Sequence, residues 1–183
     1  FDTPVILKMC TRVAHSQSIV DTTERAEREM IPYEKNIAKY VMMPGNAIRR
    51  HPVVEERTRK LAQWAETAPV NRVEEGADHK IGIITSSTSY QYVREVFGPK
   101  ASVLKLGLSW PMPVEKIRSF AAQVDQVLVV EELEPIIENH CRQIGVMVTG
   151  KEKIPLVNEL TQGVVARCLG RPEKPTMTME DPV

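Results

Sequence analysis

Residues 126–138 read QVLVVEELEPIIE, a short apolar run followed directly by glutamates, a proline and a second apolar run. The run Gln126–Val130 has the length of a buried strand. Pro135 suits the first position of a helix, where no backbone N–H partner is needed. A strand that passes into a helix within a few residues is the building unit of α/β proteins. The fold class therefore depends on whether this unit recurs.

The unit recurs at intervals of about 20 to 25 residues. Predicted strands and the helical patterns that follow them alternate from residue 81 onward: IGIIT (81–85), a helix over 89–97, SVLKLGL (102–108), a helix from Pro113, QVLVV (126–130), a helix from Pro135, and VMVTG (146–150). Residues 154–171 have helical character, with Gly170 as a stop signal. This alternation predicts an α/β domain with a mainly parallel open sheet and helices on both faces.

The first third of the chain has a different pattern. Residues 4–9 resemble a short buried strand, and the polar segment 21–40 is rich in helix-forming residues. The Pro-Gly pair at 44–45 predicts a turn, and Pro52 then begins a helix that continues to about Glu66. Residues 71–80 are a polar loop. We therefore expect a largely helical N-terminal extension before the α/β domain.

Composition excludes several functional classes. Lys plus Arg and Asp plus Glu number 24 each, so the net charge is zero and the broad positive field of a nucleic-acid-binding protein is missing. No apolar run has the length of a membrane span, and no signal-peptide pattern occurs. The scattered Cys10, Cys141 and Cys168 predict neither a disulfide framework nor a metal site. A reducing cytoplasm is the expected location.

Glu131 and Glu132 stand at the carboxyl end of a predicted strand, where α/β proteins bind their ligands. They have two interpretations, a catalytic acid/base pair or an ordinary strand-to-helix turn. Adjacent strand residues point to opposite faces, so the two carboxylates diverge and do not share a substrate. Acids near a helix N-terminus are also favoured by its dipole. We interpret both as positional residues in a solvated or interface-facing turn.

The stretch TSSTS at 85–89 ends another predicted strand. Its hydroxyls and free N–H groups would suit an anion, which makes Ser86, Ser87 and Thr88 candidate ligand-binding residues. The alternative is that one of them caps the helix. The loop lacks the GxGxxG pattern of a dinucleotide site.

Arg12 and His15 follow the predicted first strand, where a cation and an imidazole would meet an anionic substrate or a neighbouring domain. His140 and Cys141 are neighbours on a helix and do not face each other; Cys141 is predicted to lie in the core. Walker A, HExxH and GxSxG motifs are absent, as are cysteine clusters for iron–sulfur ligation. The residues alone predict no catalytic residue and no metal site.

Several blocks together resemble the middle of the large (alpha) subunit of indolepyruvate:ferredoxin oxidoreductases. The blocks that carry the resemblance are TRVAHS (11–16), YVMMPGNAIRRH (40–51), KIGIITSSTSYQYVREVFG (80–98), LKLGLSWPMP (104–113), VLVVEELEP (127–135) and GKEKIPLVNELT (150–161). Each block is modest by itself, and their order and spacing make the resemblance specific.

The resemblance implies a domain organisation. Residues 1–78 would be the end of a pyrimidine-binding domain and a helical linker, and residues 79–170 a transketolase C-terminal-like domain. Residues 171–183 would lead to a diphosphate-binding domain. The abrupt start at Phe1 and the proline-rich end are expected for a piece of a longer protein.

The resemblance also implies a reaction, the oxidative decarboxylation of an aryl 2-oxo acid to an acyl-CoA. The full-length subunit would use thiamine diphosphate, Mg²⁺ and 4Fe–4S clusters, with a beta subunit, ferredoxin and coenzyme A as partners. No cofactor is expected in this segment, because its site in such enzymes lies between the pyrimidine-binding and diphosphate-binding domains, and the segment carries neither in full. Arg12, His15, Glu131 and Glu132 are then candidates for a domain interface, and no catalytic residue is transferred.

Two other functions remain open from the sequence. An independent α/β domain would bind a small ligand at TSSTS and show saturable binding by itself. An interaction module would dock a partner through residues 40–51 and show no turnover in any assembly.

Overall fold

A computed structural model describes residues 1–173 of the chain. The chain forms two compact units, one of residues 1–59 and one that begins at Lys60, and the boundary lies within the helix Pro44–Thr67. The elements are, in order, α1 (Thr11–Ala14), α2 (Ile37–Tyr40), α3 (Pro44–Thr67), β1 (Arg72–Glu74), β2 (Ile81–Ser86), α4 (Ser89–Phe97), β3 (Ser102–Leu106), α5 (Val114–Ala121), β4 (Gln126–Val130), α6 (Ile136–Gln143) and α7 (Gln162–Cys168).

The sheet of the second unit has four strands in the order β1-β3-β2-β4. β2 pairs in parallel with β3 on one side and with β4 on the other, and β1 pairs with β3 antiparallel. The strand that follows β3 in sequence therefore lies on the far side of β2, as in doubly wound α/β folds. The predicted mainly parallel open sheet is confirmed.

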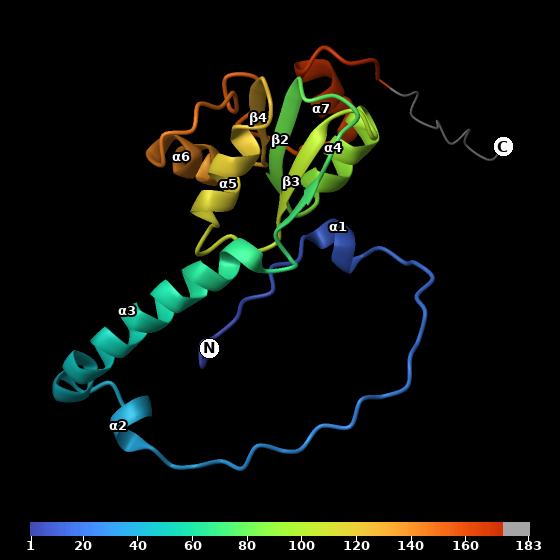
Figure 1. Cartoon of the computed structure of the whole chain (residues 1–183). Helices are drawn as coiled ribbons and strands as arrows, with labels where there is room; N and C mark the ends of the chain where they lie inside the picture. The colour runs from blue at the N-terminus through green and yellow to red at the C-terminus, as the bar shows by residue number, and fades with distance from the viewer. Residues whose placement is uncertain (174–183) are drawn as a thin grey trace. The chain divides into compact units, whose positions relative to one another are not determined.

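Helices cover both faces of this sheet, as predicted (Figure 1). One core cluster joins α4 and α7 to the sheet through residues such as Tyr90, Val93 and Val165. The other joins α5 and α6 to the opposite face through residues such as Ile117 and Cys141. The apolar stripes of α4, α5 and α6 explain this packing, because each helix buries the residues that recur three or four positions apart.

Three elements of the second unit differ from the predictions. Within the loop expected over residues 71–80, Arg72–Glu74 forms β1, which pairs antiparallel with β3. A strand of three residues is too short to recognise from periodicity. The strand expected over residues 146–150 is wrong, because only Thr149 forms a bridge, to Leu128. Residues 154–161 contain no helix, and α7 begins only at Gln162. Gly170 does end the helical segment, with a φ of 62°.

The first unit contains helices, as expected, but most individual predictions there are wrong. The strand expected over residues 4–9 does not form, and its apolar residues are solvent-exposed, with Ile6 at 93%. A strand needs a partner for its backbone, and none of the described strands pairs with this segment. Within the polar segment 21–40 only α2 is helical, because isolated helices without a buried face are marginal.

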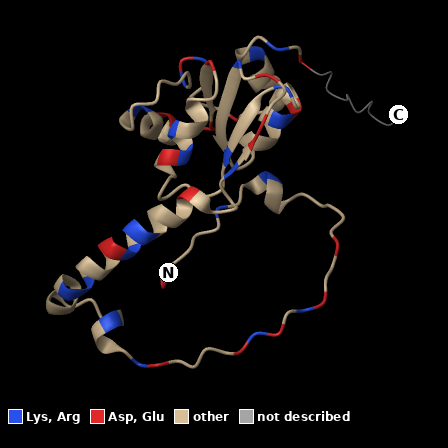
Figure 2. Cartoon of the chain, in the orientation of Figure 1, with Lys and Arg blue, Asp and Glu red and all other residues tan. Residues whose placement is uncertain are grey.

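The helix that follows is longer than predicted. α3 begins at Pro44, so the Pro-Gly turn expected at 44–45 is wrong and Pro52 lies inside the helix instead of opening it. Pro44 suits the first position of the helix because no backbone N–H partner is needed there, which is the reason that Pro52 was expected to begin it. Figure 2 shows both signs of charge along α3. The helix ends at Thr67, close to the predicted Glu66.

The linker expected over residues 171–183 lies mostly outside the described residues. Within residues 1–173, no helix combines the length and the apolar character needed to cross a bilayer.

Candidate functional site

The carboxyl ends of β2 and of its neighbour β4, the last strand in the sheet order, lie side by side. Thr85 and Val130 are register partners, and the buried Thr85 hydroxyl donates a hydrogen bond to the Val130 carbonyl oxygen over 2.7 Å. The chain leaves β2 toward α4 on one face and leaves β4 toward α6 on the other. Such a switch point is where open α/β sheets bind ligands. The structure thus brings the TSSTS and Glu131–Glu132 stretches together.

Glu131 is a helix-capping residue in this structure. Its side chain is only 7% exposed, and its two carboxylate oxygens accept hydrogen bonds from the backbone N–H groups of Ile137 and Glu138, over 2.8 and 3.0 Å. These are N–H groups of the first turn of α6, which have no partner within the helix. The predicted solvated turn is therefore wrong at Glu131, because the carboxylate is buried under the helix that it caps.

Glu132 points elsewhere, as predicted from strand alternation. Its Oε1 accepts a hydrogen bond from the backbone N–H of Leu160 over 2.8 Å. The residue is exposed, whereas Leu160 is buried in the core cluster of α4 and α7. The two adjacent glutamates therefore hold two different segments, one in front of each face of the sheet.

Two residues that the sequence analysis missed complete the cluster. Glu138 is 2% exposed; its carboxylate accepts the backbone N–H of Lys151 over 2.8 Å and pairs with Arg142 at 2.6 Å. The Lys151 ammonium donates to the backbone carbonyl oxygens of Glu131 and Pro155, over 2.6 and 3.3 Å. The sequence signal was the Gly-Lys pair at 150–151. A Cβ at Gly150 would overlap the Glu138 carboxylate, so glycine is needed there.

The protonation equilibria of this cluster reflect burial. Burial raises the pKa of Glu131, although the two N–H donors and the Lys151 ammonium act in the opposite direction. Burial also lowers the pKa of Lys151, against the attraction of the surrounding glutamates. Shifts of this kind are typical of catalytic acids and bases, and also of structural ion networks. The bonding here favours the structural case, because both groups are hydrogen-bonded to backbone atoms that hold the fold.

The β2 end of the switch point is less engaged. Thr88 is the N-cap residue of α4, but its side chain makes no capping hydrogen bond, so the capping interpretation is wrong for this residue. Ser87 is exposed and has a φ of 53°, a left-handed conformation that is uncommon outside glycine. Ser86 ends β2 and is half-buried. The hydroxyls stand where an anion would meet the first turn of α4.

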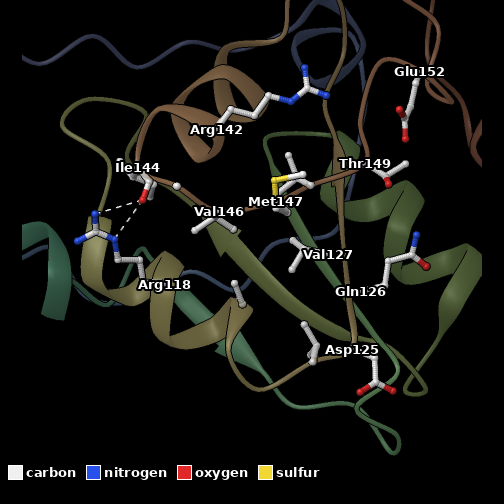
Figure 3. A pocket seen from close by; sticks show the side chains of 14 residues that line it. Arg118, Asp125, Gln126, Val127, Arg142, Ile144, Val146, Met147, Thr149 and Glu152 are labelled. Atoms are coloured by element: carbon white, nitrogen blue, oxygen red, sulfur yellow. Dashed lines mark hydrogen bonds between the residues drawn. The ribbon is translucent and has the colours of Figure 1, made fainter.

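A groove of the second unit lies elsewhere, along the outer edge of β4 (Figure 3). It is open and has a volume of about 920 Å³. Arg118 on its wall donates two hydrogen bonds to the Ile144 carbonyl oxygen, and Arg142 pairs with Glu138. Met147, which the groove also contains, is 88% exposed. The groove is a shallow surface between helix ends, and its arginines support the backbone and the buried Glu138.

The remaining candidates are placed as follows. Arg12 lies in α1 and His15 follows it, both exposed, in the first unit. Their assignment to a domain interface stays a prediction. Cys141 is buried in the core, as predicted, and burial raises the pKa of its thiol to about 12. All three cysteines are free.

Iron–sulfur clusters and magnesium ions are held by ligand side chains gathered at one place. Residues 1–173 contain no group of three or more His, Cys, Asp or Glu side chains arranged to hold a metal ion. The residues at the switch point therefore do not fit an iron–sulfur cluster or a magnesium diphosphate, and no reaction step is assigned to them.

Comparison with curated proteins shows extended similarity to one kind of subunit. The chain is 32% identical over 173 residues to the indolepyruvate oxidoreductase subunit IorA of Pyrococcus horikoshii, which covers 86% of this chain and 27% of that protein. The corresponding subunit of Methanothermobacter marburgensis is 31% identical over 179 residues, or 91% of this chain and 29% of that protein. The subunit of Archaeoglobus fulgidus is 32% identical over 150 residues, or 79% and 24%.

The resemblance to the large subunit of indolepyruvate oxidoreductases is confirmed by these matches. The chain spans about a quarter of the length of these curated relatives. No family model matches the chain. Among solved structures, the 2-oxoglutarate:ferredoxin oxidoreductase from Magnetococcus marinus with 2-oxoglutarate, coenzyme A and succinyl-CoA bound is 24% identical, with a TM-score of 0.46, over 60% of this chain and 20% of that one.

Proposed function

We propose that this chain is a middle segment of the large subunit of a cytoplasmic 2-oxo acid oxidoreductase that acts on aryl 2-oxo acids, typically indolepyruvate. The similarity to IorA subunits over most of the chain supports this assignment. Within that enzyme, the segment is a structural and assembly domain with no complete active site. Residues 1–78 end the preceding domain and form a helical linker, residues 79–170 form the transketolase C-terminal-like domain, and residues 171–183 lead to the next domain.

The observation that carries the structural role is the bonding of the switch-point glutamates. Backbone N–H groups donate to both carboxylate oxygens of Glu131, to Oε2 of Glu138 and to Oε1 of Glu132; the donors belong to α6 and to residues 151 and 160. A general acid or base needs an oxygen within hydrogen-bond reach of a substrate proton. These oxygens instead hold a helix start and two loop segments, so their removal would disturb the domain before it disturbed any chemistry.

The complete enzyme would bring the reacting groups from other domains and subunits. Thiamine diphosphate with Mg²⁺ would supply the carbanion chemistry, and 4Fe–4S clusters would carry electrons to ferredoxin. A beta subunit would complete the complex, and coenzyme A would receive the acyl group. Arg12, His15 and Glu132, together with the turn that follows Glu131, would contribute to contacts with neighbouring domains.

The test is an anaerobic viologen-reduction assay on the complete natural subunit with its partner, supplied with indolepyruvate and coenzyme A. The 183-residue chain is the matched control. We expect activity from the complex and none from the chain alone. A complete complex that oxidises no aryl or branched 2-oxo acid would refute the assignment.

A second candidate function is ligand binding at Ser86, Ser87 and Thr88. It is favoured by the side chain of Thr88, which does not cap α4. Under this alternative the chain alone would bind a small anion saturably, and Ser86→Ala with Thr88→Ala would abolish the binding. Under the structural assignment, the same double variant leaves the chain and the complex unchanged.

A further inference from the structure

A cluster of three cations surrounds one aspartate in the first unit. The Asp2 carboxylate lies 2.7 Å from the Lys39 ammonium and 3.3 Å from the Arg50 guanidinium. The Arg57 guanidinium donates to the backbone carbonyl oxygen of the same Asp2. Lys39 comes from α2, and Arg50 and Arg57 lie about two turns apart on α3. Figure 2 shows basic residues on both helices.

The charges of this cluster do not balance. Three cations and one carboxylate leave a surplus of two positive charges within hydrogen-bond distance of a single residue. The side chains of the cluster also differ in how exposed they are. The side chains of Lys39 and Arg50 are 27% and 22% exposed, whereas that of Asp2 is 61% exposed. The carboxylate is therefore the most accessible member of the cluster, and the cations behind it are the better enclosed.

The cluster lines a depression in the surface. Its volume is about 440 Å³, and its walls include Thr3, Pro4 and Tyr40 together with the four charged residues. The Lys39 ammonium lies 5.1 Å from the centre of the Tyr40 ring. The Asp2 side chain is itself part of the wall, so this volume is additional to the space that its carboxylate occupies. The space is sufficient for a larger anion and for a group bonded to it.

Asp2 is held in a strained backbone conformation. Its φ is 52°, in the left-handed region that non-glycine residues rarely adopt. Strain of this kind persists where surrounding contacts overcome it, and it gathers at sites that bind ligands or switch between states. Here the contacts are the cations themselves. Lys39 and Arg50 hold the pKa of Asp2 below its ordinary value, because both donate to the ionised carboxylate.

We propose that Lys39, Arg50 and Arg57 form a binding site for the phosphate group of a phosphate monoester, and that the Asp2 carboxylate occupies this site when no ligand is bound. With Asp2 displaced, three cations face a phosphate dianion, which neutralises more of their charge than a single carboxylate does, and its three terminal oxygens match three cationic donors. Asp2, freed from the cations, leaves its strained conformation. The site is independent of the activity proposed above.

The experiment is isothermal titration of the 183-residue chain with phenyl phosphate, inorganic phosphate and acetate in separate runs. We expect phenyl phosphate and inorganic phosphate to bind and acetate to bind at least about tenfold more weakly, because it carries one charge. Tighter binding of phenyl phosphate than of inorganic phosphate would identify a monoester as the ligand. Equal or tighter binding of acetate would overturn the phosphate assignment.

The variants test the site residue by residue. Arg50→Ala should weaken phenyl phosphate binding by about tenfold or more. Arg49→Ala is the matched control, since the Arg49 guanidinium donates to the Asn46 side chain over 2.7 Å and not to Asp2. Asp2→Asn should tighten binding by about tenfold, because it removes the competing carboxylate. That gain separates the site from a purely structural role, since a misfolded variant would bind less.

The proposal is refuted if Asp2→Asn binds no phosphate, or binds it more weakly than the unchanged chain. It is also refuted if Arg49→Ala and Arg50→Ala weaken binding equally, which would indicate general attraction to a basic surface. Circular dichroism of each variant accompanies the titrations. If only the Asp2→Asn variant remains folded, the direction of its change in phosphate affinity still decides the question.

Discussion

The carboxyl ends of β2 and β4 adjoin each other in one sheet, yet they differ in how fully their side chains are used. At the β4 end, Glu131 caps α6 and Glu132 holds the segment at Leu160. At the β2 end, Thr88 makes no cap with its side chain and Ser87 has a left-handed φ. The position of a residue at a switch point identifies a place for a ligand, and the bonding state of its side chain decides whether it is available for one.

The sharpest test of this difference removes Glu131. Glu131→Ala should lower the free energy of unfolding by about 3 kcal/mol, because two N–H groups of α6 lose a charged, buried partner. Glu132→Ala removes one hydrogen bond from an exposed carboxylate and should cost about 1 kcal/mol. Chemical denaturation of both variants measures the difference. Equal, small losses would contradict the capping role.

The second test crowds the same cluster without removing a charge. Gly150→Ala places a Cβ against the Glu138 carboxylate and should destabilise the domain by about 2 kcal/mol. Gly45→Ala is the control, because the space around Gly45 in α3 is open; this change should be neutral or stabilising by about 0.5 to 1 kcal/mol. A Gly150→Ala chain that melts like the unchanged one would show that the Glu138 cluster is loosely packed.

The β2 end should respond in the opposite direction. Ser87→Gly relieves a left-handed φ of 53° at an exposed position and should stabilise the domain by about 0.5 to 1 kcal/mol. Ser86→Gly, in the last position of β2, should instead destabilise it by a similar amount of about 0.5 to 1 kcal/mol. Thermal melting of the two variants gives the sign. Destabilisation by Ser87→Gly would mean that the Ser87 side chain has a structural partner.

The smallest expected effect is a pH dependence from His140 in α6. Burial lowers the pKa of this imidazole, and its Nε2 has no hydrogen-bond partner within the described residues. Because the folded pKa lies below the ordinary 6.5, the stability contribution is present above that pH and is lost as the pH falls through the folded pKa. His140→Phe should flatten this acid-side decline in melting temperature, and His79→Phe in an exposed loop should leave it unchanged.

The α/β domain could be predicted because its elements have strong local signals. The helix over Ser89–Phe97 and the strand over Gln126–Val130 were predicted with their observed bounds, since the helix has the periodicity of one buried face and the strand is a short continuous apolar run. The divergence of Glu131 and Glu132 followed from strand alternation alone. The capping role of Glu131 could not be predicted from strand alternation, because α6 must fold back over a side chain that precedes the helix.

The first unit could not be predicted in the same way. The apolar run near Ile6 has the composition of a strand but no partner for its backbone among the described strands.

In the second unit, the role of Lys151 could not be predicted either. It depends on a contact across twenty positions, to the Glu131 carbonyl, which no local pattern contains. Tertiary contacts, which single-sequence patterns do not encode, decide both cases.

The central claim, that the switch-point carboxylates are structural, is tested most directly by Glu131→Gln in the complete natural complex. Turnover per assembled complex in the anaerobic viologen assay is measured beside melting temperature and subunit assembly. The account predicts a lower melting temperature and turnover within about twofold of the unchanged enzyme, since glutamine retains one acceptor and no reacting group is lost. A loss of turnover of about a hundredfold or more, with assembly and melting unchanged, would contradict it.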